Sequence, residues 1–269
     1  MPELFRDAVG TEHKIVTGDA ARIVSLVPSI TELLFDLDLG AQVVGRTQFC
    51  VHPAEKVDNV PTVGGTKKIN LVKFRDLKPT HVILNIDENT KEIAADLRKL
   101  VPNLIVTHPL VPRDNLDLYR LIGTIFGRLP KAESLCTEFE TTFRSVSTFA
   151  PRLPERRVLY MIWKDPWMTV SRNTYIARML DLVRWRSVMD DPKMRYPKPD
   201  MARVLKDADL VLLSSEPYAF TDDDVAAFKQ SYDTKGKIVR TIDGAMVSWY
   251  GSRAIQGLKY LRQTAAETK

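Results

Sequence analysis

The strongest constraint on the fold is a repeated alternation of short apolar runs with segments of helical periodicity. Apolar runs occur at 22–27, 42–45, 81–85 and 104–107, and segments of helical spacing occur at 30–39, 70–77 and 90–100. A short apolar run bounded by turn residues is typical of a buried strand, and its alternation with helices predicts a parallel sheet with helices on its faces.

The pattern changes in the middle of the chain and then returns. Segments 115–126 and 130–149 have helical periodicity and little strand character. Beyond two prolines, strand patterns at 158–163, 210–214 and 237–241 alternate with helical patterns at 174–183, 222–230 and 252–265. These patterns predict an α/β fold of two lobes with central parallel sheets, joined by one long backbone helix, with a ligand cleft between the lobes. The expected boundaries are an N-terminal extension (1–21), a first lobe (22–112), a connecting helix (113–154) and a second lobe (155–269).

Composition and motifs exclude several classes. The 44% hydrophobic and 27% charged residues are those of a globular protein. Basic pairs such as Lys67-Lys68 are typical of solvated surface, so no nucleic-acid partner is expected. No apolar window is long enough for a membrane span. Cys50 and Cys136 form no Cys-x-x-Cys unit, so neither a zinc ribbon nor a redox pair is indicated.

No catalytic apparatus is visible in the sequence. The nucleophile elbow, the zinc-protease helix motif and the phosphate-binding loop motif are all missing from it. Loop carboxylates and histidines occur, but nothing in the sequence links them into a triad. We therefore expect a protein that is not an enzyme.

Several segments resemble a known family. In the first half these are 24–35, 43–47, 63–65 and 77–82, and in the second half they are 162–168, 212–218 and 248–253. They are similar to the helical-backbone (class III) periplasmic substrate-binding proteins, and in particular to the cobalamin-binding or helical backbone metal receptor subgroup. The resemblance runs from about Arg22 to the end of the chain.

The resemblance implies a function. It implies non-enzymatic binding of a cobalamin-like or other metal-chelate ligand (corrinoid, haem or ferric siderophore) by an ABC-transporter-type substrate-binding protein or a leaderless relative of one. The alternative is a cytoplasmic metal-complex chaperone or an accessory domain of an enzyme, with catalysis itself third. No covalent cofactor is expected, and the chain is expected to be a monomer.

A flat metal chelate requires aromatic faces and a few directed polar groups at its rim. Loops that follow strands of the second lobe supply both kinds of side chain, in Trp163, Asp165, Trp167, Tyr196, Glu216, Tyr218, Trp249, Tyr250 and Arg253. The alternative for each tryptophan is a core or lid anchor.

The first lobe offers two further candidate contacts. Pro28 and Ser29 at a helix start present backbone N–H groups that can hold an anionic or amide arm, although a simple N-cap by Ser29 is the alternative. Gly64 and Gly65, followed by Lys67, predict a loop whose backbone can approach a ligand, with a plain turn as the alternative.

Phe49, Cys50 and His52 lie together in one loop. A thiolate and an imidazole both ligate metals, so His52 or Cys50 could supply one axial donor to a metal already held in a macrocycle. The alternative is a pocket wall with a buried thiol and a rim histidine. The resemblance favours Phe49 as a stacking face. No metal site formed by the protein alone is expected.

Two features bear on partners and location. The glutamates that dock relatives on a permease align with Val72 and Ala202 here, which argues against delivery to an ABC permease. The first 20 residues show no signal-peptide pattern. We therefore expect a cytoplasmic protein if Met1 is the true start, and a periplasmic one by resemblance if a leader was removed.

Overall fold

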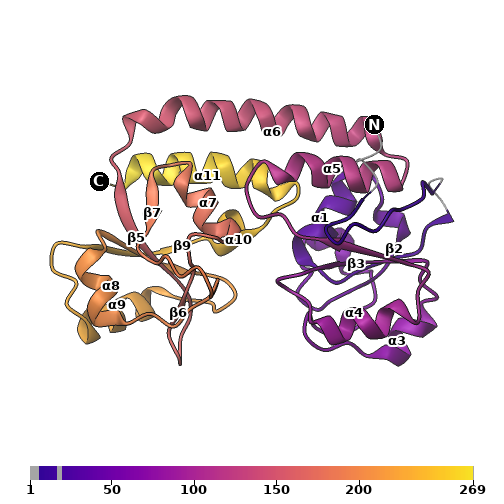
Figure 1. Cartoon of the computed structure of the whole chain (residues 1–269), viewed down its shortest axis with the longest axis horizontal. Helices are drawn as coiled ribbons and strands as arrows, with labels where there is room; N and C mark the ends of the chain where they lie inside the picture. The colour runs from indigo at the N-terminus through magenta and orange to yellow at the C-terminus, as the bar shows by residue number, and fades with distance from the viewer. Residues whose placement is uncertain (1–5, 17–19, 269) are drawn as a thin grey trace. The chain divides into compact units, whose positions relative to one another are not determined.

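The computed structural model describes residues 6–16 and 20–268, and the chain divides into two compact units. Unit 1 comprises the described residues up to 109 together with 113–139 and 250–253. Unit 2 comprises residues 110–112, 140–249 and 254–268. Each unit is built around its own sheet, so the predicted fold class of two α/β lobes is confirmed (Figure 1).

Within the described residues, the sheet of unit 1 has four strands. They are β1 (Ile23–Ser25), β2 (Val43–Arg46), β3 (His81–Asn85) and β4 (Asn103–Thr107), in the spatial order β2-β1-β3-β4. Every neighbouring pair is parallel. Parallel pairing requires a crossover after each strand, which is what the alternation in the sequence predicted.

Helices cover both faces of this sheet. They are α1 (Pro28–Asp36), α3 (Leu71–Asp76), α4 (Lys91–Arg98) and α5 (Asp114–Ile125), with a short α2 (Ala54–Val57) and a 3-10 turn η3 (Gly40–Gln42). Helices α1 and α5 lie on one face and α3 and α4 on the other (Figure 1). With both faces covered, β3 is buried along its whole length.

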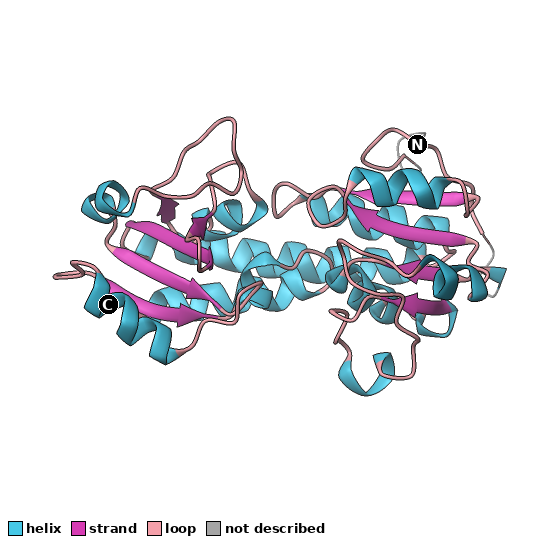
Figure 2. Ribbon diagram, turned by 90° about the horizontal axis from the view of Figure 1, so that it is seen from below, coloured by secondary structure: helices cyan, strands magenta, loops and turns pink. Residues whose placement is uncertain are grey.

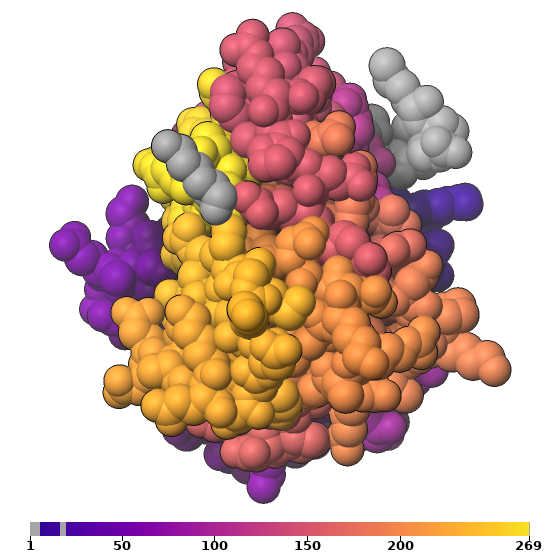
Figure 3. Space-filling model, turned by 90° about the vertical axis from the view of Figure 1, so that its left-hand side faces the viewer, coloured from indigo at the N-terminus to yellow at the C-terminus, as the bar shows by residue number. Residues whose placement is uncertain are grey.

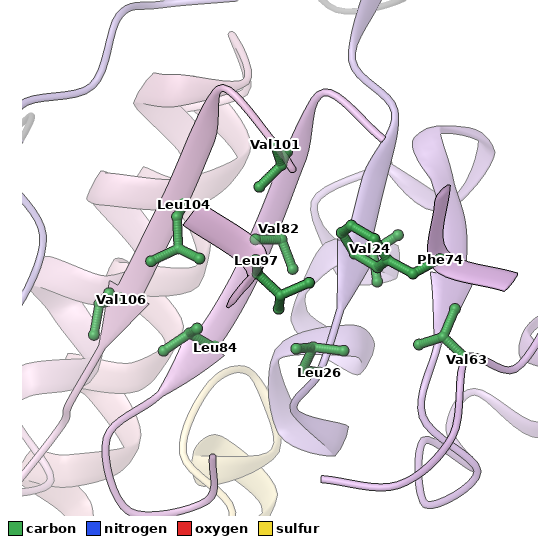
Figure 4. Close-up of a cluster of buried hydrophobic side chains, with 10 residues drawn as sticks. All are labelled: Val24, Leu26, Val63, Phe74, Val82, Leu84, Leu97, Val101, Leu104 and Val106. Carbon is green, nitrogen blue, oxygen red and sulfur yellow. The ribbon is translucent and has the colours of Figure 1, made fainter. Parts of the chain in front are cut away.

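The core between the sheet and helices α3 and α4 is formed by alternate residues of the strands. Successive strand residues point to opposite faces, so every second residue of a strand enters this core. Figure 4 shows the cluster, which consists of Val24, Leu26, Val63, Phe74, Val82, Leu84, Leu97, Val101, Leu104 and Val106. Phe74 and Leu97 are fully buried and anchor α3 and α4 to the sheet.

The sheet of unit 2 has five strands within the described residues. They are β5 (Arg156–Trp163), β6 (Met168–Thr169), β7 (Trp185–Ser187), β8 (Leu210–Ser214) and β9 (Ile238–Ile242). Strand β5 pairs in parallel with β7 and β8, and β8 pairs in parallel with β9. Strand β6 pairs with β5 in antiparallel orientation. Strands β6 and β7 were not predicted, because two or three residues are too few to show a period.

Helices also cover both faces of this second sheet (Figure 2). They are α7 (Tyr175–Asp181), α8 (Met201–Asp207), α9 (Asp222–Ser231), α10 (Gly244–Ser248) and α11 (Arg253–Glu267), with a 3-10 turn η4 (Ala150–Arg152). Residues of α8 and α9 pack with Leu159 and Leu213 in one core. A methyl group on Gly257 of α11 would meet α10 and α7, so these three helices pack closely together.

One long helix, α6 (Leu129–Phe149), connects the units. It is separated from α5 by Gly127, whose φ of 64° ends the preceding helix. Within unit 2 the end of α6 lies beside α11 (Figures 1 and 3). There Arg262 Nη1 donates to Ser145 Oγ at 2.9 Å, and its guanidinium lies 4.6 Å from the centre of the Phe149 ring.

Helix starts follow local capping chemistry, with one correction to the sequence analysis. Asn70 and Thr90 accept hydrogen bonds from the first turns of α3 and α4 as N-caps. Helix α1, however, begins at Pro28 with Val27 as its N-cap, so the alternative that Ser29 is the cap is wrong. The same helix ends at Asp36 rather than at Leu39, and Asp38 takes a left-handed φ of 57°.

The described N-terminal segment 6–16 is attached to unit 1 through Asp7. Its carboxylate accepts hydrogen bonds from Val106 N (3.0 Å) and Thr11 N (2.9 Å), and lies 3.1 Å from His13 Nε2. Burial by itself raises the pKa of Asp7, but the hydrogen bonds from His13 and the backbone outweigh burial and lower it. Among the described residues, no helix has both the length and the apolar character needed to cross a bilayer.

Candidate functional site

The loops that follow β1, β2 and β3 lie together at one edge of the unit 1 sheet, because parallel strands end on the same side. Asn89 Nδ2 donates to the carbonyl oxygens of Leu26 (3.3 Å) and Thr66 (2.9 Å). Gln48 N donates to Gly64 O at 2.8 Å. These bonds join the loop after β2, the 63–69 loop and the loop after β3 into one surface, which we call the unit 1 edge.

One aromatic ring is exposed at the unit 1 edge. The Phe49 side chain is 51% exposed, and a Cβ added to Gly65 would lie 3.3 Å from its ring. Because Gly65 has no side chain, the Phe49 ring can lie close to the backbone at that position. Gly64 has a φ of 123°, a conformation that disfavours residues other than glycine. Lys67 Nζ donates to Asp87 O at 3.2 Å across the same edge. The predicted residues Phe49, Gly64, Gly65 and Lys67 are thus brought together.

Cys50 and His52 have different surroundings. Cys50 is fully buried, and its Sγ lies 3.2 Å from Thr47 Oγ1. Burial raises the pKa of the Cys50 thiol, although hydrogen bonds from Thr31 and Thr47 act in the opposite direction. Because metals bind the thiolate, a buried thiol with a raised pKa is a poor axial donor. His52 is half-buried and so remains the better placed of the two.

Tyr250 reaches the unit 1 edge from the far end of the chain. Its phenol donates to Glu88 Oε1 at 2.5 Å, and its side chain is 7% exposed. Burial and the nearby Glu88 charge raise the pKa of Tyr250, and a contact with Ser29 partly opposes them. Ser29 is therefore buried beside Tyr250, next to the half-buried Pro28. Glu88 was not among the predicted site residues, although its position just after a strand was a usable signal.

Arg253 is held by a carboxylate of α1. Its Nε and Nη2 bond the two oxygens of Glu32 at 2.7 and 2.5 Å, and the side chains are 10% and 14% exposed. Gly251 N donates to Asn115 Oδ1 at 2.7 Å. Residues 250–253 are thus fixed to unit 1, and Arg253 positions this segment through its bidentate ion pair.

A second polar pair at the unit 1 edge was also missed. His108 Nε2 lies 3.4 Å from Asp87 Oδ1, with the side chains 20% and 23% exposed. His108 follows β4 and Asp87 follows β3. These strands pair in parallel, so their ends bring the two side chains together. The edge therefore carries hydrogen-bonding groups beside the Phe49 face.

In unit 2 the corresponding edge lies after β5 and β8, and we call it the unit 2 edge. Trp163 is 41% exposed and meets Tyr218 edge to face, with ring centres 5.7 Å apart. Lys164 Nζ lies 2.7 Å from Asp224 Oδ1 and 6.0 Å from the centre of the Tyr218 ring. Asp165 is exposed next to them.

Glu216 and Trp249 also meet in unit 2. The Trp249 indole N–H donates to Glu216 Oε2 at 2.7 Å, and Trp249 is 7% exposed. Ser214 Oγ accepts a hydrogen bond from Tyr160 (2.9 Å) and donates one to Glu216 O (2.7 Å). These bonds fix the start of the loop after β8 to the strand β5. The structure therefore joins the predicted residues Trp163 and Tyr218 as one pair and Glu216 and Trp249 as another.

Two predicted aromatics lie in other surroundings. Trp167 stacks on Phe220, with ring centres 5.8 Å apart, and meets Phe228 edge to face at 5.4 Å. These contacts are those of a core anchor, the alternative that the sequence left open for each tryptophan. Tyr196 is half-buried in a loop that bonds β6, where Thr169 N donates to Pro197 O at 3.0 Å.

No protein-only metal site is present among the described residues, since no group of three or more His, Cys, Asp or Glu side chains is placed to hold an ion. The chemistry available at the two edges is therefore aromatic contact, hydrogen bonding and charge.

Two α/β units joined by a long helix define a class of two-domain binding proteins. A family model described as periplasmic binding protein matches residues 23–238, so the chain belongs to the periplasmic binding protein family. A Bacillus subtilis protein described as an uncharacterized ABC transporter substrate-binding lipoprotein, YvrC, is 24% identical over 96% of this chain and 84% of its own length. The vitamin B12-binding protein of Vibrio cholerae is 21% identical over 73% of this chain and 71% of its own length.

Solved structures share the fold. The apo form of the periplasmic heme-binding protein RhuT from Roseiflexus sp. RS-1 has a TM-score of 0.80 and 21% identity, covering 92% of this chain and 98% of that one. The vitamin B12-binding protein BtuF of Vibrio cholerae has a TM-score of 0.75 and 16% identity, covering 93% and 98%. These likenesses support the family assignment at the level of the fold.

Proposed function

We propose that this chain is the substrate-binding component of an ABC transporter and that its ligand is a metal chelate with a flat macrocycle, either a corrinoid or haem. The observation that carries the proposal is that each unit presents one exposed aromatic face at the edge where its parallel strands end, Phe49 in unit 1 and Trp163 in unit 2. A macrocycle buries a large apolar area against such faces.

The polar groups beside these faces suit the arms of such a ligand. The Asp87–His108 pair and Lys67 lie at the unit 1 edge, and Lys164 lies beside Trp163 in unit 2. Amide or carboxylate arms need donors and acceptors of this kind at the rim of an aromatic site. A ferric siderophore, with its compact charged centre, would gain less from two flat faces.

The buried residues of the predicted site have a supporting role in this proposal. Tyr250 and Trp249 hold Glu88 and Glu216, and Arg253 holds Glu32, so these side chains position the loops that meet the ligand. That both units hold one ligand in a cleft stays a prediction. Variants in both units that weaken the same ligand would support it.

The family supports a proposal for location and for a transporter partner, against which stand Val72 and Ala202 at the positions of the docking glutamates. A relative described as a lipoprotein, together with a periplasmic family, supports a site of action outside the cytoplasm. The ligand would be carried non-covalently by a monomer and without catalysis. The alternative of a cytoplasmic chaperone or an accessory domain of an enzyme has no supporting observation in the comparisons. Fractionation of cells that express the full gene product tests the location.

The ligand test uses the purified chain with cyanocobalamin, haemin and a ferric catecholate in turn. A ligand present at 100 times its Kd stabilises the folded state by roughly 2.7 kcal/mol, which raises the melting temperature. We expect this rise, with a change in the visible spectrum, for cyanocobalamin or haemin. A response to the ferric catecholate alone would contradict the macrocycle, and no response to any of the three would contradict metal-chelate binding.

Variants test the two faces. Phe49→Ala and Trp163→Ala each remove an exposed ring and should weaken the bound macrocycle at least tenfold, equal to about 1.4 kcal/mol. Val72→Ala is the matched control, because Val72 is an exposed apolar side chain that lies on helix α3 rather than in a loop. If neither ring variant differs from the control, the ligand lies elsewhere.

The axial donor has its own test. If haemin binds, His52→Ala should change its absorbance spectrum while Cys50→Ala leaves it unchanged, because the Cys50 thiol is buried and His52 is only half-buried. The reverse result would assign the donor to Cys50. An unchanged spectrum in both variants would mean that neither His52 nor Cys50 ligates the metal.

A further inference from the structure

Helix α3 and the residues on either side of it form a basic segment. Residues 67–78 contain five basic side chains and one acidic one, a net charge of +4, whereas the whole chain has a net charge of +5. Taken alone, Lys67-Lys68 is typical of a solvated surface pair. The count over twelve residues shows instead a local concentration of charge.

These side chains face solvent. Lys67, Lys68, Lys73, Arg75 and Lys78 are all exposed. Among the described residues, Lys68, Lys73, Arg75 and Lys78 form no ion pair with a carboxylate. The positive potential of this region is therefore not neutralised within the protein and is available to an outside partner.

An exposed apolar side chain lies among the cations. Val72 is 66% exposed, more than any other large apolar residue resolved as exposed in the described chain. Phe74, two residues later, is fully buried in the core of unit 1. Because α3 is anchored through Phe74, Val72 and its charged neighbours remain on the outer side of the helix. We call Lys67, Lys68, Val72, Lys73, Arg75 and Lys78 the α3 basic surface.

The scaffold under this surface is fixed. Asn70 caps α3 by accepting from Val72 N (3.1 Å) and Lys73 N (3.0 Å). At the other end Arg22 donates from Nε and Nη2 to the Leu77 carbonyl at 3.0 and 2.7 Å. The charges therefore sit on a structured platform at both ends of the helix.

We propose that the α3 basic surface binds the headgroups of anionic lipids, so that unit 1 rests against a membrane surface. Each Lys or Arg near an anionic bilayer contributes about 1 kcal/mol of attraction. Four of the five cations are lysines, and lysine is depleted at protein–protein interfaces, where arginine and aromatic residues are enriched. The composition therefore fits a diffuse anionic surface better than a protein partner, and Val72 adds a small apolar contact. This inference does not depend on the identity of the chelate ligand.

The test measures co-sedimentation with vesicles of phosphatidylcholine alone and of phosphatidylcholine mixed with an equal amount of phosphatidylglycerol. We expect binding to the anionic vesicles at least tenfold stronger than to the neutral ones. It should fall between about 0.05 M and about 0.5 M salt, because screening shortens the range of the attraction. Equal binding to both vesicles, no binding to either, or insensitivity to salt would each overturn the proposal.

Charge reversal locates the surface. The triple variant Lys68→Glu, Lys73→Glu, Arg75→Glu should bind anionic vesicles at least about 100-fold more weakly, since three cations of about 1 kcal/mol each are lost. The matched control is Lys198→Glu, Arg203→Glu, Lys206→Glu, three exposed cations in and before α8 of unit 2, which changes the net charge equally. An equal loss in both triples would mean that only net charge acts, and would overturn the proposal.

Two further measurements keep the result interpretable. Circular dichroism and melting temperature establish that both triple variants are folded. Inorganic phosphate at the same concentration as the lipid phosphate should not compete, because the proposal assigns binding to a surface of many headgroups. Full competition by free phosphate would instead indicate a discrete anion site and would contradict a lipid surface.

Discussion

The indole N–H of Trp249 donates a hydrogen bond of 2.7 Å to Oε2 of Glu216. The next residue, Tyr250, donates in the same way to Glu88. Glu216 follows β8 and Glu88 follows β3, so two adjacent aromatic residues each hold a carboxylate at the strand ends of their own unit. The segment from Trp249 to Arg253 therefore bears on the stability of both candidate edges.

Replacing Trp249 by Phe tests the first of these bonds. The ring area is largely kept, but the half-buried Glu216 loses the indole donor, and losing such a hydrogen-bond partner costs about 1–3 kcal/mol. Urea unfolding of Trp249→Phe, Glu216→Gln and the double variant gives the coupling energy. We expect a coupling of about 1 kcal/mol. Strict additivity would mean that the bond contributes nothing to stability.

The Arg253–Glu32 ion pair should be worth far more than an exposed one. Its side chains are 10% and 14% exposed, whereas those of Arg6–Glu12 are 59% and 66% exposed. Glu32→Ala removes the carboxylate that bonds two nitrogens of the Arg253 guanidinium and should cost about 3 kcal/mol in unfolding free energy. Glu12→Ala should cost less than about 1 kcal/mol. Similar losses in both variants by urea titration would show that burial does not set the strength of these pairs.

Stability should fall as pH drops from 6.5 to 4, in part because of His81. Burial first, and the nearby His13 second, lower the pKa of His81 from 6.5 to about 4. Between pH 6.5 and pH 4, His81 is protonated in the unfolded chain and neutral in the folded chain. Unfolding therefore takes up at most about one proton, and a lower pH favours the unfolded state. The stability from neutral His81 is fully present above pH 6.5 and is lost as pH falls toward 4.

Denaturant unfolding of His81→Gln across this range measures that contribution. The variant should lose stability less steeply with falling pH than the parent chain does, and the two should be compared first above pH 6.5, where His81 is neutral in both states. Parallel pH curves for the two proteins would mean that His81 titrates alike in the folded and unfolded chain.

Gly257 on α11 tests close helix packing in unit 2. Alanine is favoured over glycine in a helix by roughly 1 kcal/mol. A Cβ at this position, however, would overlap the carbonyl oxygen of Met246. Overpacking of this kind costs roughly 1–3 kcal/mol, so Gly257→Ala should lower the melting temperature despite its better propensity. Gln256→Ala, at an exposed neighbouring position, is the control, and a stabilised Gly257→Ala would contradict the packing described here.

The longer parallel strands were predictable from the sequence, whereas the short strands β6 and β7 and much of the candidate site were not. The apolar run at 81–85 becomes a strand with the same bounds, because burial on both faces leaves a continuous apolar signal. Phe49 was correctly placed in a loop at a strand end, but nothing local distinguished its exposed ring from the core ring of Trp167. That difference depends on what α9 brings against Trp167.

The sequence by itself determined the longer strands, their order and parallel pairing, and the long connecting helix, because periodicity, caps and turn residues act over a few neighbouring positions. Only the tertiary structure decided that Tyr250 meets Glu88 and that Arg253 meets Glu32, pairs separated by 162 and 221 positions. It also decided that Cys50 is enclosed while Phe49 beside it is exposed. Burial and long-range pairing are properties of the packed chain, and no local pattern encodes which distant side chain closes a given contact.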